Sequence, residues 1–228
     1  MVSATPPGLP PAAPESSIAL HTRDGLVLEA LEHRPALERA RGRVVVCHPH
    51  PLHAGTMHNK VVTTVVRAAA ARDLATVRFN FRGVGGSQGT HDEGAAERLD
   101  VLAALARADE LSDHRGMRVL AGYSFGSAVS CAVLAGGERV DRLLLVAPPL
   151  DVRAAPPPPL PAEGLLLVVA DDDPFCSVTA AERFVASYGD ARVRLQLVPG
   201  AGHFFHGLLQ PLAEAVGAFL GPRDDVLS

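Results

Sequence analysis

Residues 119–132 read VLAGYSFGSAVSCA, and the rest of the chain is organised around this stretch. It begins as a short apolar run typical of a buried strand, continues as the pentapeptide GYSFG, and ends in small residues that can form a helix. A G-x-S-x-G pentapeptide between a strand and a helix is typical of a nucleophile elbow, where a serine projects from a sharp, strained turn. Glycine suits both flanks, because side chains there would collide across the bend. The stretch therefore predicts Ser124 as a nucleophile.

A second G-x-S-x-G pattern occurs at residues 85–89. It follows Arg82-Gly83-Val84 and precedes a polar segment, so neither a strand nor an apolar helix flanks it. The pattern alone does not make an elbow, because the chemistry needs the strand-to-helix context. We therefore expect Ser87 to be a loop residue.

Two backbone N–H groups are expected to face the oxygen of a bound carbonyl. The first belongs to Phe125, at the start of the predicted helix, where the positive end of the helix dipole adds to the effect. The second should come from the loop after an earlier predicted strand, in which Pro49 and Pro51 have no N–H to donate. His50 or Leu52 must therefore donate, and His50 is the preferred donor.

The composition is that of one globular domain. The chain has 228 residues, of which 47% are hydrophobic and 20% charged, and its net charge of −4 indicates no basic face for nucleic acid or acidic lipid. Three widely separated cysteines, Cys47, Cys131 and Cys176, predict neither a disulfide framework nor a metal or redox pair. The first residues lack the basic and apolar regions of a signal peptide, and no apolar run approaches about 18 residues, so we expect a cytoplasmic protein without membrane contact.

Strands and helices alternate along most of the chain. We expect a Pro/Ala-rich disordered tail over residues 1–16, one domain over 17–222 and a C-terminal tail over 223–228. A turn-like Arg23-Asp24-Gly25 between two apolar runs predicts a hairpin at one edge of a sheet. The later alternation predicts an α/β fold with a mostly parallel sheet covered by helices on both faces. Strands are expected at 18–20, 26–31, 43–48, 74–81, 142–147, 165–170 and 192–198, a strand and helix within 117–134, and helices at 59–71, 93–108, 178–187 and 204–220.

The partners of Ser124 should follow later strands, because ligands bind beyond the carboxyl ends of the strands in such a sheet. An aspartate triplet at residues 171–173 follows one later strand, and His203 lies in the loop after the next. The order serine, acid, histidine is the one expected for this kind of sheet. His203 would act as general base and an aspartate would orient its ring. We favour Asp173, because the residues directly after a strand usually form the turn, and Asp171 is the alternative.

His206 is a competing base, one helical turn past His203. His203 is preferred because it lies in the loop, whereas His206 lies within the helix predicted from about Phe204.

The end of the strand predicted at 43–48 and the loop that follows it contain four histidines: His48, His50, His53 and His58. Their alternation with proline prevents a common helical or strand face, and no carboxylate or thiol follows at ligand spacing. The loop at residues 82–88 misses the dinucleotide pattern G-x-G-x-x-G, because Gln88 stands where the last glycine belongs. We therefore predict neither a metal nor an organic cofactor.

Taken together, these motifs resemble the alpha/beta-hydrolase superfamily over residues 17–221. The most specific segments are CHPHPL at 47–52, GTM at 55–57, NKVV at 59–62, RFNFRGVG at 78–85 and SQG at 87–89. They resemble a bacterial subgroup of small, lidless serine hydrolases related to dienelactone hydrolases. The resemblance implies Ser124, Asp173 and His203 as a triad, with backbone donors near His50 and Phe125. Dienelactone hydrolases themselves have a cysteine nucleophile, where this chain has Ser124.

Many members of the superfamily insert a helical lid after the strand that is predicted here to end near Val146. This chain has only a proline-rich connection at residues 148–161, so we expect an open site. Leu52, Phe175 and Phe204 lie near enough to the predicted site to form an apolar substrate-binding wall together with Phe125.

The sequence thus predicts a serine hydrolase that forms an acyl-enzyme on Ser124 and cleaves short, accessible carboxylic esters, as a monomer or a homodimer. Its partner would be a small-molecule ester, and no nucleic acid is expected. A peptidase or thioesterase would use the same triad. A non-catalytic binding protein on this fold is a further alternative, although such proteins usually lose a triad member.

Overall fold

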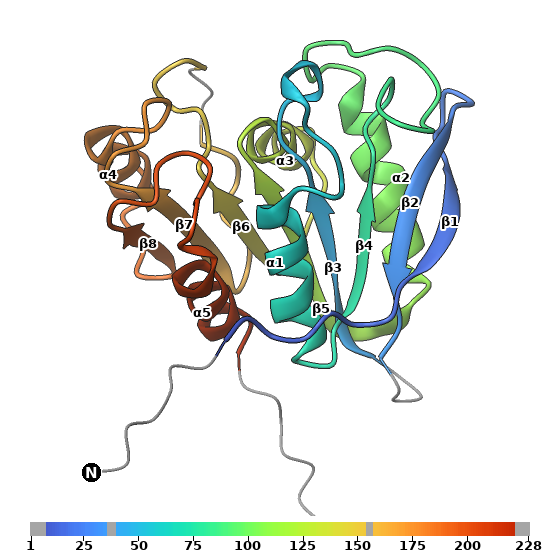
Figure 1. Ribbon diagram of the computed structural model, residues 1–228, viewed down its shortest axis with the longest axis horizontal. Coiled ribbons are helices and arrows are strands. Elements are labelled where there is room, and N and C mark those ends of the chain that lie inside the picture. Colours follow the sequence, from blue (N-terminus) through green and yellow to red (C-terminus); the bar gives the residue numbers. More distant parts are fainter. Residues whose placement is uncertain (1–7, 36–39, 154–156, 222–228) are drawn as a thin grey trace, which may run out of the picture.

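An eight-stranded sheet forms the centre of the molecule (Figure 1). The structure is a computed structural model that describes residues 8–35, 40–153 and 157–221, so residues 1–7 and the predicted C-terminal tail lie outside it. The strands are β1 (Ser16–His21), β2 (Val27–His33), β3 (Ala40–Cys47), β4 (Ala75–Phe79), β5 (Ser112–Tyr123), β6 (Arg142–Val146), β7 (Gly164–Ala170) and β8 (Val193–Val198).

The strand order is β1-β2-β4-β3-β5-β6-β7-β8. β1 and β2 form an antiparallel hairpin and β2 runs antiparallel to β4, whereas all neighbours from β4 to β8 are parallel. The predicted edge hairpin and mostly parallel sheet are confirmed. Because the parallel strands share one direction, the loops that follow them meet at the same edge of the sheet.

Helices cover both faces of the sheet, as predicted (Figure 1). The described residues form a short 3₁₀ turn, η1 (Pro51–His53), and the helices α1 (Lys60–Ala70), α2 (Glu97–Asp109), α3 (Phe125–Ala135), α4 (Val178–Ala186) and α5 (Leu209–Leu220). α1 and α5 pack on one face, and α2, α3 and α4 pack on the other. Within the described ranges no helix has the length and apolarity needed to cross a bilayer.

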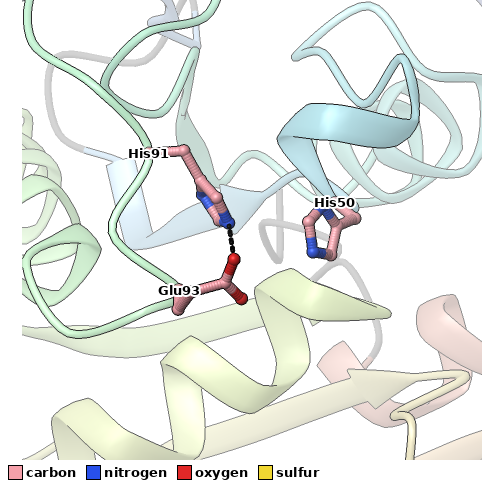
Figure 2. A group of neighbouring side chains, drawn as sticks. All are labelled: His50, His91 and Glu93. Carbon is pink, nitrogen blue, oxygen red and sulfur yellow. Dashed lines mark ion pairs between the residues drawn. The ribbon is translucent and has the colours of Figure 1, made fainter.

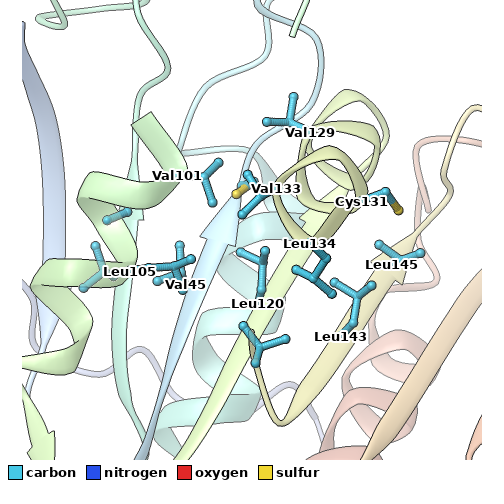
Figure 3. Close-up of a cluster of buried hydrophobic side chains, with 14 of the residues drawn as sticks. Val45, Val101, Leu105, Leu120, Val129, Cys131, Val133, Leu134, Leu143 and Leu145 are labelled. Atoms are coloured by element: carbon cyan, nitrogen blue, oxygen red, sulfur yellow. The ribbon is translucent and has the colours of Figure 1, made fainter. Parts of the chain in front are cut away.

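The larger core lies between the sheet and the α2–α3–α4 layer (Figure 3). From α3, Val129, Val133 and Leu134 enter this core, and Leu120 of β5 and Leu143 of β6 meet them from the sheet. Leu120 and Leu143 have no exposed surface. A fully buried leucine stabilises the fold by roughly 1.5–3 kcal/mol relative to an exposed one, so this packing fixes α3 against the sheet.

Successive residues at the end of β5 face opposite layers, as the pleat of a strand requires. Val119, Ala121 and Tyr123 join the cluster beneath α1 and α5, whereas Leu120 joins the cluster beneath α3. Residues 119–123 of β5 are therefore buried on both sides, which accounts for the apolar run at this end of the strand.

Two helix starts differ from the prediction. α2 begins at Glu97 rather than at 93, because the Glu97 carboxylate accepts hydrogen bonds from the backbone N–H groups of Asp92 and Gly94, both at 2.8 Å, and so closes a turn ahead of the helix. α5 begins at Leu209, because turns occupy the preceding residues and Phe205 has a φ of 52°.

Part of the predicted N-terminal tail is packed against the sheet. The carbonyl oxygen of Pro14 lies 2.8 Å from Nδ1 of His33, and the Glu15 carboxylate forms an ion pair with Arg78 at 2.6 Å. Ser16 already belongs to β1. The tail prediction is therefore corrected from residue 14 onward, since composition alone gave no sign of the ion pair.

A buried ion pair joins the loop after β4 to α2. Nη2 of Arg82 lies 2.6 Å from Oδ1 of Asp100, and the Arg82 backbone N–H donates to Oδ2 at 2.9 Å. The Asp100 side chain has no exposed surface and that of Arg82 is 6% exposed. Arg82 also reaches Asp24, in the turn between β1 and β2, at 2.9 Å. Because buried charges must be paired, this contact fixes the position of α2 against the loop.

Replacing Asp100 by alanine should lower the free energy of unfolding by about 3–5 kcal/mol, because the buried Arg82 charge loses its partner. Urea denaturation followed by circular dichroism measures the change. Asp190→Ala, which removes a surface pair with Arg192, is the control and should leave the urea midpoint almost unchanged. Equal losses in the two variants would contradict the role of the buried pair.

Candidate active site

Ser124 occupies a strained turn between β5 and α3. Its φ of 52° and ψ of −115° are costly for a residue with a side chain. A Cβ at Gly122 would lie 2.4 Å from the backbone of Gly126, and a Cβ at Gly126 would lie 2.5 Å from the carbonyl oxygen of Cys47. Glycine is therefore required at both positions by close backbone approach.

Hydrogen bonds to β6 and to the elbow itself hold this turn. The backbone N–H of Ser124 donates to the carbonyl of Val146 at 2.9 Å. The buried hydroxyl of Ser127 donates to the carbonyl of Gly122 at 2.7 Å and also lies 3.1 Å from that of Val146. These bonds compensate the strain at Ser124 and fix the direction of its side chain.

The imidazole of His203 lies between Ser124 and Asp173. Nε2 is 3.0 Å from Oγ of Ser124, and Nδ1 is 3.0 Å and 2.9 Å from Oδ1 and Oδ2 of Asp173. The Asp173 side chain has no exposed surface and the His203 side chain is 7% exposed, so water competes little for these bonds. With its proton on Nδ1, toward the carboxylate, the ring leaves Nε2 free to accept the serine proton.

The other two aspartates of the triplet position the loop that carries His203. Oδ1 of Asp171 accepts a hydrogen bond from the backbone N–H of Gly200 at 2.8 Å, and Oδ1 of Asp172 accepts one from Gly202 at 2.7 Å. Asp171, the alternative acid, thus contacts the backbone of the loop. The structure brings Asp173 rather than Asp171 to the imidazole.

Tyr123, the last residue of β5, fixes the backbone of His203. Its buried hydroxyl donates to the His203 carbonyl at 2.9 Å, and burial raises the pKa of this hydroxyl, which keeps it protonated as a donor. His206, the competing base, is exposed, and its ring contacts Phe204 with centroids 5.6 Å apart. The structure therefore brings His203, and not His206, to Ser124.

The other candidate nucleophiles are occupied or inert. Ser87 lies in a loop, as predicted, where its hydroxyl donates to the carbonyl of Asn80 at 2.6 Å and accepts from the N–H of Glu29 at 3.0 Å. The three cysteines are buried and free, and burial raises the pKa of each thiol to about 12. None of them is a thiolate near neutral pH.

The backbone N–H groups of His50 and Phe125 donate to no acceptor among the described residues. Phe125 is the first residue of α3, where N–H groups have no partner inside the helix. The His50 and Phe125 rings are adjacent, with centroids 5.0 Å apart. The N–H of Leu52, in contrast, donates to Nδ1 of His50 at 3.2 Å. Of the two N–H groups considered for the loop, only that of His50 is therefore unused.

His48 fixes the peptide group that carries the His50 N–H. Nδ1 of His48 lies 2.6 Å from the carbonyl oxygen of Pro49, and Nε2 lies 3.0 Å from the N–H of Phe81, so Nδ1 holds the proton and Nε2 accepts. In a trans peptide the Pro49 carbonyl and the His50 N–H point in opposite directions. The hydrogen bond from His48 to the Pro49 carbonyl therefore orients the His50 N–H away from the His48 ring. Burial lowers the pKa of His48 to about 4, which keeps the ring neutral.

Large apolar side chains are exposed beside His203 and on η1. Leu52, Phe175 and Phe204 are 69%, 39% and 58% exposed, and the two phenylalanine rings lie with centroids 4.7 Å and 5.3 Å from that of His203. Val152, which no sequence pattern indicated, is 65% exposed, and the backbone N–H of Asp151 donates to the Phe175 carbonyl at 3.1 Å. Nothing in the proline-rich connection signalled that it would reach this place.

His50 also meets two residues of a distant loop, His91 and Glu93, beside Phe125 (Figure 2). The three side chains offer potential metal-ligand atoms within 4.8 Å of one another. The histidines considered from the sequence all lie in one stretch, so this group was not predicted. The only available signal was the proximity of His91 and Glu93 in the sequence, which is weak.

Comparison with known proteins identifies relatives over nearly the whole chain. Residues 38–164 match the family model described as serine aminopeptidase, S33. An alpha-beta serine hydrolase homologue from Coxiella burnetii is 35% identical, with 89% of this chain and 96% of that chain covered and a TM-score of 0.78. A Xanthomonas campestris protein, described as an a/b serine hydrolase without lid, is 30% identical, with coverages of 94% and 96% and a TM-score of 0.77. An uncharacterized protein of Rickettsia prowazekii is 28% identical over 186 residues, 77% of each chain.

Stability should depend on pH through His48. Its pKa in the folded protein, about 4, lies below the ordinary value of 6.5, so protonation favours the unfolded chain. The contribution of His48 to the free energy of unfolding is complete above pH 6.5 and falls by up to about 3 kcal/mol as the pH drops to 4. His48→Asn, which keeps a donor for the Pro49 carbonyl, should flatten this part of the dependence. Urea unfolding of both proteins at pH 7 and pH 4.5 tests this prediction. If their free energies of unfolding differ by the same amount at both pH values, His48 is not a buried neutral ring.

Proposed function

The chain belongs to the alpha/beta-hydrolase superfamily, and from this premise we propose that it is a serine hydrolase that cleaves short, accessible carboxylic esters through an acyl-enzyme on Ser124. The observation that carries the proposal is the continuous chain of hydrogen bonds from Asp173 through His203 to Oγ of Ser124. It ends on a serine held in a strained turn beside two unused backbone N–H groups.

In the proposed mechanism, Oγ of Ser124 attacks the carbonyl carbon of the ester while Nε2 of His203 takes the hydroxyl proton. The C–O bond to the alcohol then breaks, and the imidazolium returns the proton to the departing oxygen. Asp173 keeps the ring in the required tautomer and stabilises its positive charge. A water molecule, deprotonated by the same nitrogen, cleaves the acyl-enzyme in the second half of the cycle.

The N–H groups of His50 and Phe125 are the proposed donors to the oxyanion that forms during each attack. Each such donor is worth roughly 3–4 kcal/mol of barrier lowering when it is fixed in advance. His48 supports the preorganisation of the first donor through its bond to the Pro49 carbonyl, and the helix start supports that of the second.

Accessible esters are favoured because the apolar wall is open to solvent. Leu52, Val152, Phe175 and Phe204 are exposed, and the described residues between β6 and β7 contain no helix that could cover them. A small acyl or alcohol group can contact these side chains without the enzyme first opening. These exposed side chains do not enclose a deep pocket, which favours esters with short acyl chains over esters with long ones.

A peptidase is the second candidate, because the matched family model is described as serine aminopeptidase. The same triad would cleave an amide, with His203 protonating the leaving amine. The two candidates differ only in the substrates that they turn over.

A substrate panel separates these functions and tests the mechanism. Wild-type protein should hydrolyse short p-nitrophenyl esters faster than acyl-CoAs or aminoacyl anilides, and a fluorophosphonate probe should label Ser124. Ser124→Ala should lose at least about a thousandfold in kcat and all labelling, because the nucleophile acts as a unit with its base. Unchanged turnover in this variant would refute the mechanism, and preferred cleavage of anilides would favour the peptidase.

Asp173→Asn and Asp171→Asn form a matched pair within the triplet. The first should lower kcat by about 10⁴-fold, because an amide favours the wrong tautomer of His203. The second should have a small effect, because its amide oxygen can still accept the Gly200 N–H. Steady-state kinetics on the best ester decides, and comparable losses in both variants would overturn the assignment of the acid.

A further inference from the structure

His50, His91 and Glu93 converge over the start of α3, with His50 just before η1 and the other two in the loop between β4 and α2 (Figure 2). Nε2 of His91 is 3.5 Å from Oε1 of Glu93, close to the separation of about 3.4 Å between two ligand atoms of one tetrahedral zinc ion. All three potential ligand atoms lie within 4.8 Å. The Glu93 side chain is 76% exposed, so it can rotate to close the remaining distance.

His91 is poorly satisfied by its surroundings. Its side chain is 8% exposed, yet neither ring nitrogen forms a well-directed hydrogen bond with any described residue. Nδ1 lies 2.7 Å from Oε1 of Glu97, a carboxylate with no exposed surface. With the proton on Nδ1, the lone pair of Nε2 faces the Glu93 carboxylate, and two electron-rich atoms oppose each other. A cation between them satisfies both.

Glu97 also holds the ligand loop in place. Its carboxylate accepts hydrogen bonds from the N–H groups of Asp92 and Gly94, which flank Glu93, while it faces Nδ1 of His91. A carboxylate behind a histidine is the arrangement that orients imidazole ligands and raises their basicity in metal sites. Glu97, a buried residue outside the ligand set, therefore fixes the backbone on both sides of Glu93.

We propose that His50, His91 and Glu93 bind a divalent transition-metal ion of the zinc type. Two imidazoles and one carboxylate suit Zn²⁺, and such a set leaves a coordination position for water or another small ligand. Mg²⁺ and Ca²⁺ prefer sets of oxygen atoms and should not compete.

The bound ion would inhibit hydrolysis. This inhibition rests on the proposed function, whereas the binding of the ion is independent of it. The rings of His50 and His91 lie with centroids 5.0 Å and 5.2 Å from that of Phe125, so the ion sits beside the proposed oxyanion donors. Ligation through Nε2 of His50 moves the remaining ring proton to Nδ1, where it opposes the N–H of Leu52 and breaks their 3.2 Å bond. The ion therefore displaces the loop that carries the His50 N–H.

Calorimetric titration with ZnCl₂ and the visible spectrum of bound Co²⁺ test the site on the full chain. One equivalent should bind, with the strong d–d absorption of a tetrahedral ion. His91→Asn should weaken binding at least about a hundredfold, and Glu93→Gln, at an exposed position that does not threaten folding, should weaken it about tenfold or more. His53→Asn is the matched control, because its ring lies 4.8 Å from that of His50 but outside the ligand set, and it should bind like wild type.

His203→Asn distinguishes this site from adventitious binding at the triad. Binding that survives in His203→Asn and is lost in His91→Asn supports the proposal, whereas the reverse overturns it, as does absence of binding to the wild-type protein. In the active protein Zn²⁺ should inhibit ester cleavage, and His91→Asn should relieve the inhibition. A protein that binds Zn²⁺ as described but cleaves no ester would refute the proposed function alone.

Discussion

The close approach of α3 to the end of β3 is the constraint on which the rest of the site depends. Gly126 lies so near the carbonyl groups of Cys47 and His48 that no side chain fits there. This contact brings the N-terminus of α3 beside the loop that follows β3. The His50 and Phe125 rings consequently lie with their centroids 5.0 Å apart, and both residues carry an unused backbone N–H. A larger residue at 126 would separate the two segments.

Polar side chains then fix each loop at this edge of the sheet. His48 holds the loop after β3, Glu97 the loop before α2, and Asp171 and Asp172 the loop after β8. In each case a side chain bonds to backbone groups of the loop, so the loops are held without a hydrophobic core of their own. This explains how histidine and aspartate can be frequent around the site while only some of them face Ser124.

Much of the fold could be predicted from the sequence, because apolar periodicity and turn residues mark the strands and helices directly. The placement of Asp173 and His203 near Ser124 also followed from the sequence, since parallel strands deliver their following loops to one edge. Other features depend on contacts between distant segments, which no local pattern reveals. The pairing of Glu15 with Arg78, the bond between the Asp151 N–H and the Phe175 carbonyl, and the meeting of His50 with His91 are of this kind. The start of α5 was misjudged for a related reason, because the turns ahead of it are stabilised by tertiary contacts of the His203 loop.

The exposed apolar wall would affect the fate of the acyl group that the proposed mechanism places on Ser124. Enzymes that close over their substrates exclude water and can pass an intermediate to a chosen acceptor. Here no helix among the described residues between β6 and β7 covers the site, so the carbonyl would stay open to bulk solvent. Partitioning of the intermediate between acceptors would then follow their concentrations. Water, the most abundant acceptor, would win, so the architecture suits hydrolysis and disfavours acyl transfer to other alcohols.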